Sequence, residues 1–188
     1  FTRDDASVGS GATSIDRNAL CYFTIGSTKL GLLGLHLKSN PDDPYANAKR
    51  MAEAEIARRI IQKEIVGRGY TPIVLGDLND YDPDVPDRDE SRDTKTHVLK
   101  NLKDYDSQAE GDELVNAAIK VVRQEDRYTS HWDRNENGAD DYYDVKTMLD
   151  HVLLHKSLWP GVRRVMIDHS HSLLTSDHFP VVVDLELP

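Results

Sequence analysis

Apolar and polar positions in the first third of the chain predict two strands followed by a helix. Apolar runs mark neighbouring strands over residues 17–25 and 30–38, separated by a turn at Gly26. A helix is expected next, because Asp43 is a favourable N-cap and Pro44 fits the first helical turn. Both strands are expected to lie side by side in one sheet.

The expected helix has one apolar face and one charged face. Its apolar residues recur every four positions, at Ala48, Ala52, Ile56 and Ile60. Gly67 and Gly69 are expected to end it. Its basic residues, Arg50 among them, are interpreted as a solvated face paired with neighbouring glutamates. A continuous apolar run over 71–75 predicts the next strand, so strand, helix and strand form a βαβ unit with Asp77 at the carboxyl end of its sheet.

The remaining pattern predicts a mixed α/β fold. A polar, proline-containing segment over 81–112 is expected to be a surface loop. Two helices are expected to interrupt or follow it, from about 94 to 103 and from 112 to 122. Further strands are expected at 128–132, 148–154, 162–167 and 181–187. A chain of 188 residues is long enough to bury the core of one domain.

Ionisable side chains occur at or inside four of these apolar strands. They are His36, Asp77 with Asn79 close behind it, Asp150, and the adjacent pair Asp177 and His178. Burying either member of an Asp–His pair costs several kcal/mol unless it meets a counter-charge or a metal. One such residue alone is more often a satisfied structural group. Four in one chain indicate a common chemical site.

The order and spacing of these motifs resemble those of the endonuclease/exonuclease/phosphatase superfamily. The matching segments are HLKS around His36, GDLND around Asp77, LDHVLL around Asp150 and SDHFP around His178. That superfamily includes deoxyribonucleases, abasic-site endonucleases, bacterial extracellular nucleases, neutral sphingomyelinases and inositol polyphosphate phosphatases, and HLKS and GDLND look closest to the bacterial extracellular nucleases. The resemblance, which runs from about Arg17 to the C-terminus, implies an α/β fold that is part of a four-layer αββα sandwich.

The resemblance also implies a role for each residue of the carboxylate motifs. Asp77 would orient or deprotonate the attacking water and contact a catalytic Mg²⁺ or Mn²⁺ ion, and Asp177 would hold that ion. Asn79 would donate a hydrogen bond to a phosphoryl oxygen. Each of these functions is one that hydrolysis of a phosphodiester needs.

The basic residues of the motifs have implied roles as well. His178 would donate to the scissile phosphate, while Asp150 accepts from its other ring nitrogen and fixes the tautomer. His36 would be a second imidazole beside the phosphate. Arg17 resembles an arginine that contacts phosphate at the start of a strand, and a solvated surface arginine is an equal alternative.

One part of the superfamily pattern is missing. Its members carry earlier strands, one of which supplies a metal-binding glutamate, whereas the first glutamate here is Glu53 in the expected helix. We therefore expect residues 1–188 to be the C-terminal portion of one such domain, with its N-terminal strands missing. The alternative is a member without the usual metal site.

Charge and composition narrow the choice of partners. The chain has 23 basic and 33 acidic residues, which gives a net charge of −10 and disfavours tight nonspecific binding to nucleic acid. A divalent ion and a local basic patch can offset this repulsion, so nucleic acid stays the expected substrate. Cys21 is the only cysteine, which excludes an intrachain disulfide. No apolar run in these 188 residues is long enough to span a membrane, and no signal peptide lies within them; a signal could belong to the N-terminal part that is expected to be missing. The resemblance slightly favours an extracellular or periplasmic location.

A further motif is independent of the superfamily. The segment 133–144 has oxygen-bearing side chains at positions 1, 3, 5, 9 and 12 of a calcium-loop pattern, namely Asp133, Asn135, Asn137, Asp141 and Asp144. Gly138 occupies position 6, and the Ala139 carbonyl would be a backbone ligand. These features favour a structural Ca²⁺ site. A hydrophilic turn between two strands is an equal alternative, because no helix is expected before the loop.

The motifs together favour a metal-dependent phosphodiester hydrolase, and a nuclease in particular. The alternatives are a phosphatase or sphingomyelinase-like phosphoesterase and, from a different class, an inactive module that binds phosphate or a partner. The motifs do not distinguish DNA from RNA or endonuclease from exonuclease cleavage, and they do not predict an oligomeric state.

Overall fold

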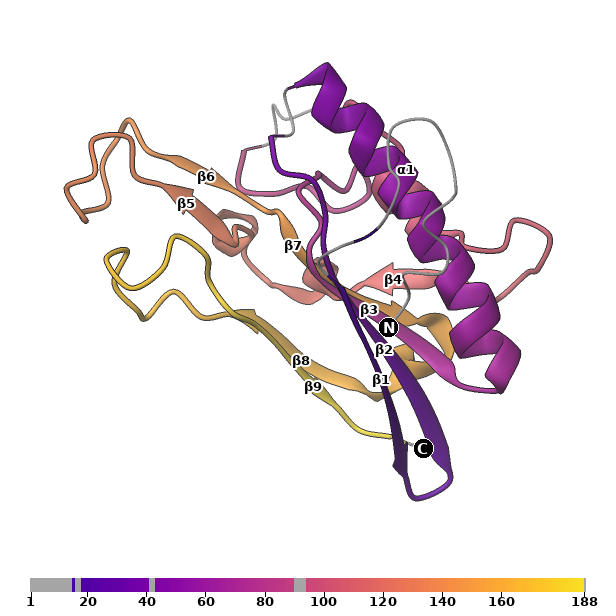
Figure 1. Ribbon diagram of the computed structural model, residues 1–188. Helices are drawn as coiled ribbons and strands as arrows, with labels where there is room; N and C mark the ends of the chain where they lie inside the picture. The colour runs from indigo at the N-terminus through magenta and orange to yellow at the C-terminus, as the bar shows by residue number, and fades with distance from the viewer. Residues whose placement is uncertain (1–14, 16–17, 41–42, 90–93, 188) are drawn as a thin grey trace.

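A mixed five-stranded sheet forms the centre of the computed structural model, which describes residues 15, 18–40, 43–89 and 94–187 (Figure 1). In spatial order its strands are β1 (Asn18–Ile25), β2 (Thr28–His36), β3 (Thr71–Asp77), β7 (Asp150–His155) and β4 (Leu114–Asn116). Strands β1 and β2 are antiparallel around the Gly26 turn, as the apolar pattern predicts. The sheet is therefore built mostly from segments that the sequence identifies as strands.

Helix α1 (Pro44–Ile60) completes the predicted βαβ unit. The Asp43 carboxylate caps it by accepting a hydrogen bond from the Tyr45 backbone N–H at 3.0 Å. The chain continues through a π-helical turn (Ile61–Ile65) and a 3₁₀ turn (Val66–Arg68), and leaves the helix at Gly69 with a left-handed φ of 77°. Strand β3 then runs parallel to β2, in a register that pairs His36 with Asp77.

The two helices expected in the middle of the chain have different outcomes. Helix α2 (Val98–Lys103) confirms the C-terminal part of the first. The helix expected over 112–122 is wrong, because this segment forms β4 and then a 3₁₀ helix (Ala117–Lys120). Residues Leu114–Asn116 pair with the open edge of β7, and such tertiary pairing overrides a weak helical periodicity.

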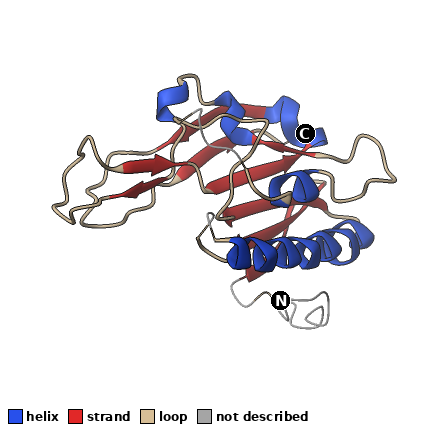
Figure 2. Cartoon of the chain, turned by 90° about the horizontal axis from the view of Figure 1, so that it is seen from above, coloured by secondary structure: helices blue, strands red, loops and turns tan. Residues whose placement is uncertain are grey.

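A second, two-stranded sheet lies on the face of the central sheet opposite α1. Its strands are β8 (Val162–Ile167) and β9 (Val181–Leu185), and a 3₁₀ helix (Lys156–Gly161) leads into it. One apolar core joins α1 and α2 to the central sheet, and another joins the central sheet to β8 and β9. Figure 2 shows the long helix along one side of the strands. The described residues thus form an αββ arrangement of layers.

A small hairpin projects from the edge of this structure (Figure 1). It consists of β5 (Ser130–Trp132) and β6 (Val145–Thr147), joined by the predicted calcium loop. A 3₁₀ turn (Gln124–Asp126) precedes it. None of the helices in the described part of the chain is long and apolar enough to cross a membrane.

Candidate active site

Three of the ionisable residues that the sequence singles out meet at one end of the central sheet. Asp77 is the last residue of β3, and Asp150, the first residue of β7, lies opposite it in the antiparallel register. His178 precedes β9 and is joined to β5 by a bridge with Ser130. One potential ligand atom from each of Asp77, Asp150 and His178 lies within 4.8 Å of the other two.

His178 and Asp150 form a short charged hydrogen bond. His178 Nδ1 donates to Asp150 Oδ2 at 2.7 Å, and this bond raises the pKa of His178 to about 9 although partial burial opposes the shift. The imidazole is therefore protonated at neutral pH. The buried Thr129 hydroxyl fixes the start of β7 by accepting from the backbone N–H groups of Leu149 and Asp150. Sequence reasoning missed Thr129, which carries no signal beyond its place before β5.

The Asp77 carboxylate is held by the residue two positions further on. Its Oδ1 accepts from the Asn79 backbone N–H at 2.9 Å, and its Oδ2 accepts from Asn79 Nδ2 at 2.8 Å. Burial and the neighbouring negative charge of Asp150 raise the pKa of Asp77. His36 Nε2 lies 3.5 Å from Asp77 Oδ2, on a side chain that is 45% exposed. Asp77 is thus a fixed carboxylate with an increased affinity for a proton.

The Asn79 side chain is buried and donates its hydrogen bonds to protein groups, Asp77 among them. Its amide donates one hydrogen bond to Asp77 and another to the Leu37 carbonyl at 3.1 Å, so both amide hydrogens are used. The residue is buried and has a left-handed φ of 52°, which asparagine tolerates better than most residues. The hydrogen bond to a phosphoryl oxygen that the sequence predicts for Asn79 would require one of these contacts to break.

One predicted site residue of the described part of the chain, Asp177, does not join this cluster. The Asp177 side chain is exposed and is not among the clustered ligand atoms of the described residues, although its charge contributes to the raised pKa of His178. The Asp177 backbone carbonyl accepts from His131 N–H at 2.8 Å. Arg17 lies outside the described residues, so its predicted phosphate contact stays a prediction.

A buried ion pair supports the turn that follows Asp77. Arg50 is fully buried, which shows that its interpretation as part of a solvated face is wrong. Its Nε donates to Asp80 Oδ2 at 3.1 Å and its Nη1 to the Lys38 carbonyl at 2.7 Å. The Thr96 hydroxyl also donates to Asp80. The guanidinium thereby ties α1 to the segment after β2 and to the GDLND turn.

A buried histidine holds the same turn from the other side. His151 Nε2 donates to the Asp80 carbonyl at 2.8 Å, and its Nδ1 accepts from Asn116 Nδ2 at 3.0 Å. Burial lowers the pKa of His151, so the ring is neutral and both nitrogens are satisfied. The signal that sequence reasoning could have used is the position of His151 inside the apolar run of β7, a strand of the central sheet that has an apolar core on both faces.

The predicted calcium loop is closed by its own side chains. Oxygens of Asp133, Asn135 and Asn137 each accept a backbone N–H two to five residues further along. Asp141 Oδ2 accepts from the amides of Asn135 and Asn137, at 2.6 and 2.8 Å. At the base of the loop Asp144 accepts from the Asp141 N–H and from His131 Nε2, both at 2.9 Å, and these bonds lower the pKa of Asp144. The oxygens therefore turn inward, and most of them already have a donor.

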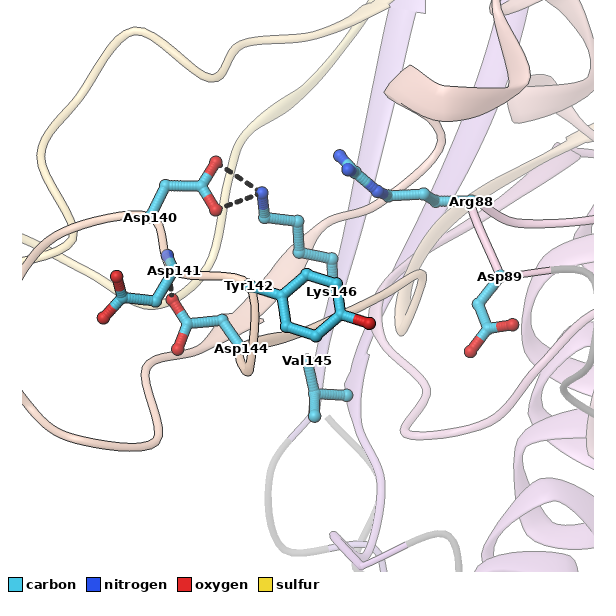
Figure 3. A pocket seen from close by; sticks show the side chains of 8 residues that line it. All are labelled: Arg88, Asp89, Asp140, Asp141, Tyr142, Asp144, Val145 and Lys146. Carbon is cyan, nitrogen blue, oxygen red and sulfur yellow. Dashed lines mark hydrogen bonds and ion pairs between the residues drawn. The ribbon is translucent and has the colours of Figure 1, made fainter.

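A polar cavity of about 650 Å³ lies beside this loop. Figure 3 shows Arg88 and Lys146 reaching into it from different segments, with Lys146 paired to Asp140. The cavity is lined by Arg88, Asp89, Asp140, Asp141, Tyr142, Asp144, Val145 and Lys146. None of the clustered residues Asp77, Asp150 and His178 lines it, so the cavity and the candidate active site are separate features.

Comparison with known proteins identifies the fold. No protein-family model matches the sequence, and no curated protein matches it. The endonuclease domain of TRAS1, a telomere-specific non-LTR retrotransposon, superposes with a TM-score of 0.60 at 15% identity, over 93% of this chain and 65% of the other. The 3′–5′ exonuclease NExo from Neisseria meningitidis gives 0.59 at 18% identity, over 89% and 65%. TDP2 from D. rerio, complexed with single-strand DNA product, gives 0.51 at 18% identity, over 89% and 60%.

These structures are longer than the present chain, which spans 65% or less of the length of each. Nearly nine tenths or more of this chain is aligned with each of them. The chain therefore has the fold of the endonuclease/exonuclease/phosphatase superfamily, to which these neighbours belong.

Proposed function

We propose that this protein is a divalent-metal-dependent phosphodiester hydrolase that cleaves nucleic acid. The observation that carries the proposal is the meeting of Asp77, Asp150 and His178 within 4.8 Å at the end of the central sheet. This arrangement places a carboxylate base beside a protonated imidazole, which is the pairing that phosphoester hydrolysis uses. The names of two structural neighbours, an endonuclease and an exonuclease, favour nucleic acid as the substrate class.

The donor atoms fit a magnesium or manganese ion. Asp77 and Asp150 offer carboxylate oxygens, which these ions prefer as ligands. Two carboxylates this close repel each other, which contributes to the raised pKa of Asp77, and a bound cation would relieve that repulsion. When bound, the ion would supply positive charge to the non-bridging oxygens of the phosphate. Asp177 stays a proposed additional ligand.

The side chains of the cluster have complementary tasks in this proposal. His178 holds its Nδ1 proton against Asp150, which points its protonated Nε2 away from that carboxylate and towards a phosphate oxygen. Asp77 orients the attacking water or accepts its proton, from a position at the end of β3 beside Asp150. Asn79 keeps the Asp77 carboxylate in one orientation through two hydrogen bonds.

A substrate panel tests the proposal. Linear DNA, RNA, sphingomyelin and an inositol polyphosphate are each incubated with the protein in Mg²⁺ or Mn²⁺, and again with a chelator. Metal-dependent cleavage of DNA or RNA supports the proposal. His178→Gln should lower that cleavage, whereas the matched control His97→Gln, at an exposed histidine next to α2, should not. Turnover of the lipid or inositol substrate alone would instead support the phosphatase or sphingomyelinase-like alternative. Phosphate binding without any turnover would support the inactive module.

We also propose that the loop 133–144 binds a structural Ca²⁺ ion. The side-chain oxygens of Asp133, Asn135 and Asn137 point into the loop, which supports this proposal. A bound cation would stabilise such closely spaced carboxylate and amide oxygens. Asp144 would have to share its carboxylate with His131, to which it is already bonded. The Asp133 carboxylate is therefore the better position at which to test the site.

A further inference from the structure

The strand register places Ser130 and His178 face to face. Two backbone hydrogen bonds of 2.8 Å flank the pair, from His131 N–H to the Asp177 carbonyl and from Phe179 N–H to the Thr129 carbonyl. This is the pattern around a non-hydrogen-bonded antiparallel pair, whose Cα atoms are about 4.5 Å apart and whose side chains leave the same face. The side chains of Ser130 and His178 therefore lie on one face of β5.

Trp132 lies on that same face. Successive side chains of a strand alternate, so Trp132 follows Ser130 on the His178 side, about 7 Å further along the strand. The intervening residue, His131, points the opposite way and is buried against Asp144. Trp132 is 60% exposed. A solvent-exposed indole ring thus lies on the same face of β5 as His178 of the candidate active site, two residues beyond the Ser130–His178 pair.

A cation is already stacked on this indole. The Arg134 guanidinium lies 5.4 Å from the centre of the Trp132 ring, a cation–π contact that orients both groups. Within the described residues no carboxylate forms an ion pair with Arg134, so its charge is available to a ligand. An aromatic ring beside an arginine is the combination that binds single-stranded nucleic acid, since the ring stacks on a base and the cation meets a phosphate.

We propose that Trp132 and Arg134 bind an unpaired nucleotide next to the phosphate at His178, so that the substrate is single-stranded or frayed nucleic acid. Bases inside a duplex are already stacked on their neighbours and do not offer a free face to the indole. The positive charge of Arg134 beside the Trp132 ring complements the backbone of such a strand in a chain whose net charge is −10. This inference rests on the proposed nuclease function.

Trp132 fluorescence tests the contact directly and independently of turnover. The chain has two tryptophans, so Trp159→Phe leaves Trp132 as the single indole. In a chelator, which prevents metal-dependent cleavage, a single-stranded oligonucleotide should quench this fluorescence with saturation. A fully paired duplex and an abasic oligonucleotide of equal length should not. The matched variant Trp132→Phe, which keeps only Trp159, should show no quenching with any of them.

Kinetics test the consequence for substrate choice. Trp132→Ala should lower kcat/KM for a single-stranded substrate by about 5- to 150-fold, the loss expected for one base–aromatic stack. Hydrolysis of a small nitrophenyl phosphodiester should stay within about twofold, because it has no base to stack. Phe23→Ala, which removes an exposed ring near the β1–β2 turn at the opposite end of the sheet from Asp77, should leave both rates unchanged.

The inference would be overturned if single strands did not quench Trp132, or if the duplex and the abasic strand quenched it as much as the intact single strand. A Trp132→Ala variant that cleaves single strands as well as the unmodified protein would overturn it too. If Trp132 fluorescence falls as the protein concentration rises with no oligonucleotide present, the inference is also overturned. That result would identify this face as a contact between two copies of the protein. If the unmodified protein cleaves neither nucleic acid nor the nitrophenyl diester, the proposed function fails, and the fluorescence titration still decides the binding inference separately.

Discussion

Replacing Asp150 by asparagine should lower the pKa of His178 from about 9 towards the 6.5 of a free imidazole. The Asp150→Asn side chain keeps the shape of the original and loses its charge. In the unmodified protein the hydrogen bond from His178 Nδ1 to Asp150 Oδ2, at 2.7 Å, is the main cause of the raised pKa. The same substitution removes the negative charge that raises the pKa of Asp77. One change therefore moves the two pKa values of the proposed acid and base in the same direction.

The size of the stability effect follows from the His178 pKa. A pKa of about 9 in place of 6.5 corresponds to about 3.4 kcal/mol of extra stability for the charged imidazole. The His178 side chain is 34% exposed, so solvent screening reduces the expected value to about 1–2 kcal/mol. Because the folded-state pKa is raised, this stabilisation is fully present below pH 6.5 and is lost as the pH rises through about 9.

NMR titration of the imidazole nitrogens in a chelator measures the His178 pKa, with His178→Gln identifying the signal among the eight histidines. Urea unfolding at pH 6 and pH 10 measures the stability difference between Asp150→Asn and the unmodified protein. The difference should be about 1–2 kcal/mol at pH 6 and close to zero at pH 10. A His178 that titrates near 6.5 in the unmodified protein, or a pKa unchanged by Asp150→Asn, would refute this reasoning.

Three further predictions concern the surroundings of the cluster. Arg50→Met should destabilise the protein by about 3–5 kcal/mol in urea unfolding, because it leaves the buried Asp80 charge unpaired. The control Arg59→Met, on the half-exposed side of α1, should change the stability little, and equal unfolding midpoints for the two variants would contradict the prediction. Asn79→Ala should lower kcat by about 10²-fold with a smaller change in KM, since it releases the Asp77 carboxylate, and an unchanged kcat would show that Asp77 needs no support. Millimolar Ca²⁺ should raise the melting temperature, and Asp133→Ala should abolish that rise; a melting temperature indifferent to Ca²⁺ in the unmodified protein would leave the loop a polar turn.

The elements that local patterning specifies strongly were predictable from the sequence. The Asp43–Pro44 start of α1 and the apolar runs of β2 and β3 fix a βαβ unit, and parallel pairing then brings His36 beside Asp77. The segment 112–122 was not predictable in this way. Its few apolar residues suit a helix or a strand, and pairing of Leu114–Asn116 with the distant β7 decides between them.

The sequence motifs predicted which residues form the cluster, but they did not predict all of the hydrogen bonds around it. The motifs place Asp77, Asp150 and His178 at strand ends, and the sheet topology brings those ends together. The burial of Arg50 could not be inferred, because its charged helical neighbours resemble a solvated face and its partner Asp80 lies 30 residues away. The use of both Asn79 amide hydrogens depends on the close approach of the carbonyl of Leu37, the residue that follows β2.

The most direct measurement of the central proposal is the rate of nucleic-acid cleavage by Asp77→Ala in Mg²⁺ or Mn²⁺, beside the unmodified protein. If Asp77 is the base and a metal ligand beside His178, the substitution should lower kcat by about 10²-fold or more while the circular dichroism spectrum and melting behaviour show a folded protein. Asp84→Ala, which removes an exposed carboxylate from the loop after β3, should retain full activity. An Asp77→Ala protein that cleaves nucleic acid within a few-fold of the unmodified rate would contradict the assignment of the active site.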